Sequence, residues 1–123
     1  MALKTYRDLT VWRKAMDLVV AVYDLSRRFP PEERYGLASQ LQRAAVSVPA
    51  NIAEGYARVH RGDYLRHLSI ARGSKAEMET HLTIATRLGF AQREDTLPVW
   101  ELAQDVGRLL NALIKSLEDA PDN

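Results

Sequence analysis

At 123 residues, the chain has the length of one compact domain, residues 1–123, and is too short for two domains of ordinary size. Hydrophobic residues make up 46% of it and charged residues 27%, a balance too apolar for a disordered protein, and without cysteine it can hold neither a disulfide nor a sulfur-ligated zinc. The sequence shows no signal-peptide core and no apolar run near the roughly 18 residues of a membrane span, so we expect a cytoplasmic protein without membrane contact.

The net charge of +1 conceals a division along the chain. Residues 1–75 hold 13 basic and 7 acidic residues, a net charge of +6, whereas residues 76–123 hold 4 and 9, a net charge of −5. This asymmetry fits either a basic surface for nucleic acid or the pairing of oppositely charged helices within a bundle or between subunits. The second interpretation is the more common one, and both stay open at this point.

The first predicted helix runs from about Asp8 to Arg28. It ends before Pro30 and Pro31, because proline cannot donate in a helix and pushes its predecessor out of helical geometry. Apolar residues recur at helical spacing and predict one buried face, formed by Leu9, Trp12, Met16, Val19, Val20 and Tyr23.

The second predicted helix begins near Tyr35. We expect Pro49 to kink it without ending it, because two side-chain patterns keep their phase across the proline. The first pattern is an apolar stripe, Leu37, Leu41, Ala44, Ala45, Val48, Ile52 and Tyr56. The second is a narrow polar stripe, Gln40, Arg43, Ser47, Asn51, Glu54 and Arg58.

The polar stripe is unusual because its central members, Ser47 and Asn51, are short and neutral. Such residues suit a half-buried network in which each group finds a partner. We therefore favour a contact with a neighbouring helix or subunit, with Arg43 paired to Glu77, over a ligand site.

Asp63 is the predicted N-cap of a third helix that runs to about Leu88, with Gly89 in the left-handed C-terminal position and Phe90 packing back. Small residues at Ala71, Gly73 and Ser74 predict a close approach of another helix. The expected inward positions are Tyr64, Leu68, Ala71, Ser74, Met78, Leu82 and Ala85.

Asp95 or Thr96 is the predicted cap of a fourth helix, and the tail 118–123 is expected to fray. Its apolar stripe is long: Val99, Leu102, Ala103, Val106, Leu110, Leu113, Ile114 and Leu117. Short connections between four helices, with no alternating pattern of a strand, predict an all-α protein with an antiparallel up-down-up-down four-helix bundle.

Sequence signatures of catalysis are missing: we find no phosphate-binding glycine loop, nucleophile elbow or metalloprotease motif, and predict neither a catalytic residue nor a cofactor. Asp63 with His67 and Glu77 with His81 have the spacing of metal ligands. The two pairs lie about 21 Å apart along a helix, so they cannot share one ion, and we interpret each as a solvated helix pair.

Clustered basic residues are the candidate nucleic-acid surface, since arginine and lysine bind backbone phosphates and tyrosine can stack on unpaired bases. The isoelectric point of 8.1 is below the value of about 9 typical of nucleic-acid-binding domains, but an oligomer could strengthen a weak patch. The candidates are Arg27, Arg28, Arg58, Arg61, Arg66, Arg72 and Lys75, with His60, Tyr56 and Tyr64 nearby.

Four segments carry a family resemblance: residues 8–15, 29–37, 70–79 and above all 40–55, QLQRAAVSVPANIAEG. In them the chain resembles the proteins encoded within intervening sequences of bacterial 23S ribosomal RNA genes. It is also distantly similar to the accessory proteins of diversity-generating retroelements, which bind nucleic acid and a reverse transcriptase.

This resemblance implies a four-helix bundle without enzymatic activity that forms a ring-like homo-oligomer, a pentamer. Our first functional hypothesis is a pentameric scaffold that binds RNA, or less readily DNA, through the second and third helices. The alternative is a protein-interaction hub with no nucleic-acid binding, in which the charge asymmetry serves subunit pairing. The sequence names no protein partner.

Overall fold

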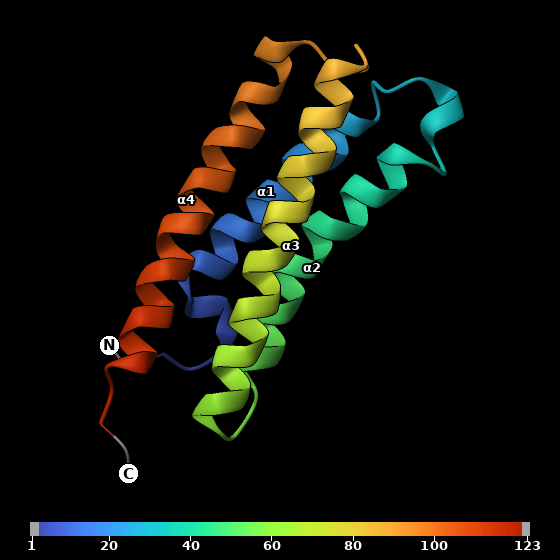
Figure 1. The fold of residues 1–123 in the computed structure, drawn as a ribbon. Helices are drawn as coiled ribbons and strands as arrows, with labels where there is room; N and C mark the ends of the chain where they lie inside the picture. The colour runs from blue at the N-terminus through green and yellow to red at the C-terminus, as the bar shows by residue number, and fades with distance from the viewer. Residues whose placement is uncertain (1–2, 122–123) are drawn as a thin grey trace.

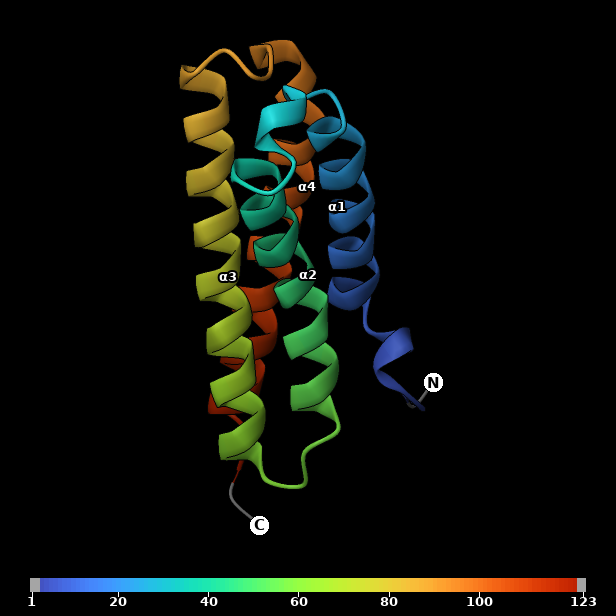
Figure 2. The ribbon, with the colours of Figure 1, turned by 90° about the vertical axis from the view of Figure 1, so that its right-hand side faces the viewer.

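The computed structural model describes residues 3–121, which form four α-helices joined by short connections. Consecutive helices run in opposite directions (Figure 1). Helix α1 packs against α2 and α4, and α3 packs against the same two, so α1 and α3 occupy diagonal corners of the bundle (Figure 2). The described part contains no strand. The predicted antiparallel four-helix bundle is confirmed, with helices α1 Thr10–Ser26, α2 Leu37–Tyr56, α3 Arg61–Arg87 and α4 Arg93–Glu118, and one-turn 3-10 helices at Tyr6–Asp8 and Pro31–Glu33.

The buried face of α1 differs from the predicted one, although Leu9, at the N-cap, is buried as expected. Met16 and Val20 are 39% and 59% exposed, while Trp12, Val19 and Tyr23 are only half-buried. Helix α1 carries two apolar stripes, and periodicity alone could not say which of them faces the core. The core takes the other stripe, which consists of Val11, Ala15, Leu18, Val22 and Leu25.

The apolar stripe of α2 is confirmed, because every predicted member is buried except the half-buried Tyr56. The helix begins at Leu37, two residues later than expected, since Gly36 has a non-helical backbone (φ −106°, ψ −115°). It continues through the buried Pro49, as expected. The kink at this residue stays a prediction.

Helix α3 begins earlier than predicted, with His60 in the N-cap position and Asp63 inside the first turn. Its end is as predicted: Gly89 has φ +78°, a conformation that favours glycine, and the Phe90 amide donates to the Ala85 carbonyl at 2.9 Å. The aromatic ring of Phe90 then packs on that of Phe29, with 6.0 Å between the centroids.

Helix α4 is capped by Gln92 and not by Asp95 or Thr96, which lie within its first turn. Most of the centre of its predicted stripe is buried, whereas Leu102 and the C-terminal members Leu113, Ile114 and Leu117 are half-buried. Between residues 3 and 121, no helix is both long and apolar enough to cross a membrane. The core members from α4 are Val99, Ala103, Val106 and Leu110.

Candidate functional site

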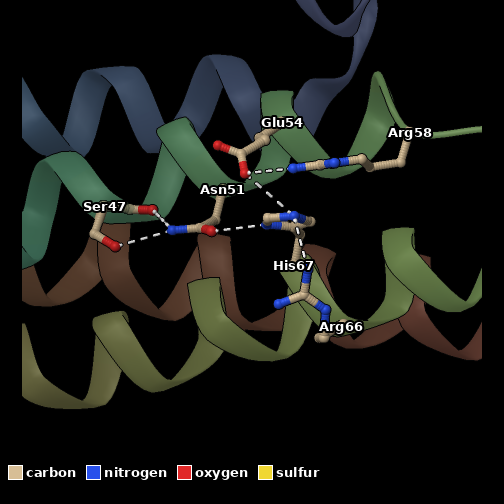
Figure 3. Close-up of polar contacts among 6 residues, drawn as sticks. All are labelled: Ser47, Asn51, Glu54, Arg58, Arg66 and His67. Carbon is tan, nitrogen blue, oxygen red and sulfur yellow. Dashed lines mark hydrogen bonds and ion pairs between the residues drawn. The ribbon is translucent and has the colours of Figure 1, made fainter.

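The middle of the polar stripe on α2 is hydrogen-bonded to α3 (Figure 3). The Asn51 amide nitrogen donates to the Ser47 carbonyl at 2.9 Å and lies 3.0 Å from the Ser47 hydroxyl, which in turn is 2.7 Å from the hydroxyl of Ser74 on α3. The Asn51 oxygen lies 3.0 Å from Nδ1 of His67, also on α3. On the other side of the ring, Nε2 is 3.2 Å from the Glu54 carboxylate. These groups form one polar seam between the two helices.

Geometry restricts the hydrogen atoms of the His67 ring. A carbonyl oxygen only accepts, so the contact with the Ser47 carbonyl fixes the Asn51 amide nitrogen on that side and its oxygen toward the ring. Nδ1 must therefore carry a hydrogen. The other nitrogen, Nε2, has two neighbours. In a doubly protonated ring it would donate to the Glu54 carboxylate at 3.2 Å. In a neutral ring it would accept from the Arg66 guanidinium, and at 3.5 Å this hydrogen bond is the weaker of the two.

The seam lacks the arrangement of a nucleophilic catalyst. Activation of a serine needs a base within hydrogen-bond reach of its hydroxyl, but Ser47 and Ser74 bond to each other and Asn51 lies between them and the ring. The His67 side chain is also only 5% exposed. These groups join α2 to α3.

Gly55 allows the close approach of α2 and α3 at this seam. A Cβ at this position would lie 2.8 Å from the Cβ of His67 and 3.2 Å from the carbonyl oxygen of Tyr64. The sequence had suggested Gly73 for this role, which is wrong: Gly73 is exposed, and a Cβ there would meet nothing within 4 Å. Its predicted neighbour Ser74 does lie at the contact.

The two N-terminal members of the stripe do not join the seam. Gln40 and Arg43 are both exposed, and the Arg43 guanidinium has no hydrogen bond or ion pair within residues 3–121. The expected pair of Arg43 with Glu77 is not formed within the chain, because the Glu77 carboxylate lies 3.1 Å from Nε2 of His81, one turn along its own helix. Nδ1 of His81 is buried without a hydrogen-bond partner in the described region.

The structure divides the predicted basic residues between the two ends of the bundle. Arg27 and Arg28 follow α1 and pair with Asp24 at 2.7 Å and Asp95 at 3.3 Å. They lie at the α3–α4 end, far from the turn between α2 and α3. These two arginines therefore cannot share one continuous surface with the other five in a single chain.

The other five basic residues lie near the α2–α3 turn or along α3. Arg58, Arg66 and Arg72 are exposed, although Arg58 pairs with Glu54 at 3.2 Å and Arg72 donates to Asn111 at 3.3 Å. Lys75 is mostly buried and pairs with Glu79 at 3.0 Å. Arg61 donates to the backbone carbonyl of Ala120 at 2.6 Å, which links the start of α3 to the tail. The fraying of the tail stays a prediction.

Tyr56 and Tyr64 lie next to these arginines and pack edge to face, with 6.1 Å between ring centroids. Burial raises the pKa of Tyr64 to about 12, and the neighbouring Tyr56 adds to this effect. The Tyr64 phenol is thus neutral near pH 7, so it packs beside the arginines and does not pair with them as an anion.

The metal-like pairs of the sequence are not alike. The predicted pair of Asp63 with His67 is wrong, because the His67 ring contacts Asn51 and Glu54 instead. The predicted pair of Glu77 with His81 does form, although the His81 side chain is mostly buried and not solvated. No cluster of three or more potential ligands that could hold a metal ion occurs in residues 3–121.

Sequence reasoning missed His67, the centre of the seam. A signal was present, since His67 shares the helical stripe of Ala71, Ser74 and Met78 and is buried with most of it. A histidine on an inward stripe needs polar partners, and the facing stripe of α2 supplies them.

The fold and the seam define a helical-bundle protein whose polar residues bind its own helices together. The sequence profile of one family, the 23S rRNA-intervening sequence proteins, matches residues 7–112. The chain belongs to this family, as its resemblance had implied. No curated protein sequence matches it significantly.

A crystal structure shows the same fold. It is of a protein of unknown function from the S23 ribosomal protein family of Bacteroides thetaiotaomicron VPI-5482, 24% identical in sequence. The match has a TM-score of 0.80 and covers 86% of this chain and 99% of the other. At this identity the likeness concerns the fold alone.

Proposed function

We propose that the protein is a non-enzymatic, homo-oligomeric scaffold that binds RNA through the end of the bundle where α2 meets α3. One observation carries the proposal: from Glu54 to Lys75 the chain has five basic and two acidic residues, and three of the arginines, Arg58, Arg66 and Arg72, are exposed there. Clustered guanidinium groups bind backbone phosphates; Arg58 and Arg66 lie on the side of α3 that faces α2, and Arg72 lies on the side that faces α4.

A single chain offers few such contacts, so we infer that self-association multiplies them. The resemblance to ring-forming relatives makes a pentamer the expected assembly. Five copies of a weak patch on one rigid body would bind an RNA that spans them far more strongly than one copy could. The family name, which refers to intervening sequences of 23S rRNA, makes structured RNA the first ligand to test.

The test is a filter-binding titration at low salt with an RNA hairpin and a single strand of equal length. Replacing Arg58, Arg66 and Arg72 together by alanine should weaken binding. It should also reduce the steepness of the plot of log K against log salt concentration, by about one for each phosphate that is no longer neutralised. The control replaces Arg34, Arg43 and Arg108, which removes the same charge elsewhere. If neither RNA binds, or if both triple variants behave alike, the proposal is wrong.

A second candidate function, a protein-interaction hub without RNA binding, is supported by the exposed apolar side chains of α1, Met16 and Val20. It predicts that a protein partner stays bound after nuclease treatment and that the two triple arginine variants keep it equally well. A DNA hairpin in the same titration tests whether the protein binds DNA in place of RNA.

A further inference from the structure

The turn between α2 and α3, residues 57–60, lies at one end of the bundle, and every residue of it is exposed (Figure 2). Val59 in this turn is 92% exposed, more than any other large apolar side chain between residues 3 and 121. Turns favour glycine, proline, asparagine, aspartate and serine, whose side chains suit a tight backbone. At this exposure Val59 gains nothing from packing within the chain, so its apolar side chain is available to a partner.

The ring of His60, next to Val59, is free as well. His60 is the N-cap residue of α3, a position where short side chains such as serine or aspartate accept hydrogen bonds from the amides of the first turn. Its own side chain caps no amide, and its ring makes no hydrogen bond or ion pair within residues 3–121. The turn thus presents a flat, unbonded ring beside an exposed apolar side chain.

The two tyrosines beside the turn are less available than Val59 and His60. Tyr56, at the end of α2, and Tyr64, near the start of α3, are half-buried and pack edge to face on each other. A Cβ on Gly55 would lie 3.0 Å from Cδ1 of Tyr64, so this ring is held against α2. The tyrosine pair therefore fixes the two ends of the turn and leaves its exposed side chains to meet a ligand.

Guanidinium groups flank the turn. Arg58 lies within it, and Arg66 is exposed on α3 and forms no ion pair with a residue between 3 and 121. The nearest acidic residues in the sequence are Glu54, which already pairs with Arg58 at 3.2 Å, and Asp63, which is half-buried. Arginines beside a free ring can bind the phosphates of a nucleic-acid strand while the ring contacts its bases.

Duplex and unpaired RNA offer different surfaces to such a turn. In an A-form duplex the base faces are stacked on each other, and the major groove is too deep and narrow for side chains to enter. In a loop or a single strand the bases can turn outward and stack on aromatic rings. A flat ring and an apolar side chain therefore gain contacts from unpaired bases that a duplex does not provide.

We propose that the α2–α3 turn binds unpaired bases of RNA, with His60 stacked on one base and Val59 packed against the next. Arg58 and Arg66 bind the phosphates of the same strand. The inference rests on the RNA binding proposed above and names its substrate class, which is RNA with unpaired nucleotides. Phosphate contacts alone position an RNA without reading its bases, so the turn supplies the discrimination between loop and duplex.

An anionic membrane surface also attracts arginine, but the turn suits it less well. Membrane binding grows with the apolar area that is buried, and Val59 is the one large apolar residue among residues 57–60. A single valine provides little such area, whereas one exposed ring is enough to stack on a base. The observations therefore favour RNA.

The test compares two RNAs with equal numbers of nucleotides, a hairpin with a long loop and a blunt-ended duplex, by filter binding at one salt concentration. The wild-type protein should bind the hairpin more tightly by a factor of about 5 or more, which one base stack is enough to supply. Val59→Ser and His60→Ser should each reduce this preference, whereas His60→Phe keeps a flat ring and should retain it. The control, Leu88→Ser, changes an exposed apolar residue at the other end of the bundle and should also retain it. All three sites are exposed, so the fold should survive, and circular dichroism checks this.

The outcomes separate the turn from RNA binding itself. A wild-type protein that binds both RNAs alike, or serine variants that keep the preference, would overturn the role of the turn while leaving RNA binding standing. If the wild-type protein binds neither RNA, the proposed function fails as well. A parallel titration uses vesicles that contain phosphatidylserine. If the wild-type protein binds them and Val59→Ser does not, while the RNA preference is unchanged, the turn is a membrane contact and the inference is wrong.

Discussion

His67 shows at the scale of single residues how this bundle uses polar side chains. Its two ring nitrogens face the oxygens of Asn51 and Glu54, and Asn51 extends the chain of contacts to Ser47. When a buried polar group loses its hydrogen-bond partner, the free energy lost by removing that group from water is no longer offset. Each member of the seam should therefore matter for stability far more than the exposed members of the same stripe.

Replacing Asn51 by alanine should lower the free energy of unfolding by about 1–3 kcal/mol, because Nδ1 of His67 is left buried without its acceptor. Replacing Arg43, which is on the same stripe but exposed, should change it by less than about 0.5 kcal/mol. Urea denaturation of both variants measures the difference. Equal effects would show that the seam does not stabilise the bundle.

Tyr64 makes stability depend on pH in the alkaline range. Its pKa is raised to about 12 by burial, above the value of about 10 of an unfolded chain. The folded state thus holds a proton that the unfolded state releases, so stability is lost as pH rises from about 10 to about 12. Tyr64→Phe should reduce the fall in the urea midpoint between about pH 9.5 and 11.5, and an unchanged fall would contradict this cause.

At the scale of helices, the seam requires α2 and α3 to approach closely at Gly55. Gly55→Ala should destabilise the bundle by about 1–3 kcal/mol, because the new Cβ meets the Cβ of His67 and the backbone of Tyr64, which cannot both move away. Gly73→Ala, also within a helix, should stabilise it by about 0.5–1 kcal/mol through helix propensity. Thermal unfolding distinguishes the two, and the same sign for both would be the contrary result.

The C-terminal tail is a second contact between elements, since Arg61 donates to Ala120 beside the acidic Glu118 and Asp119. These acids also line a surface depression that contains Arg72 and Lys75. Deleting residues 119–123 should strengthen RNA binding at low salt by a factor of about 5, on the order of 1 kcal/mol, because negative charge near the phosphates is removed. Glu101→Gln, which removes a negative charge elsewhere on α4, should have less effect, and titration of both proteins compares them.

The sequence predicted the helices well and their faces unevenly. The stripe of α2 was unambiguous, because only one face of that helix is apolar. Helix α1 has two apolar stripes, so the choice between them depended on where α2 and α4 lie, which periodicity does not contain. The N-caps of α3 and α4 were placed too late, because neither His60 nor Gln92 caps with its side chain.

At the scale of the whole molecule, the site was harder to predict than the fold. The polar stripe was visible in the sequence of α2, but its partner His67 comes from another helix and depends on how the two helices meet. The separation of Arg27 and Arg28 from the other arginines is likewise a property of the bundle, because sequence distance does not say which end a residue reaches.

Assembly of several copies would allow a weakly basic chain to bind RNA. Most of the predicted cations already have a partner within the chain, so one copy presents only the exposed part of Arg58, Arg66 and Arg72. A ring of copies would repeat this surface on one side of the assembly, and the affinity would follow the number of copies that one RNA reaches.

Photocrosslinking of the assembled protein to an RNA hairpin, followed by mass spectrometry of the attached peptides, tests the central claim most directly. We expect the crosslinks to concentrate between residues 56 and 75, where Tyr56 and Tyr64 lie beside the exposed arginines. Crosslinks that concentrate on α1 or α4, or RNA that attaches nowhere, would contradict the account.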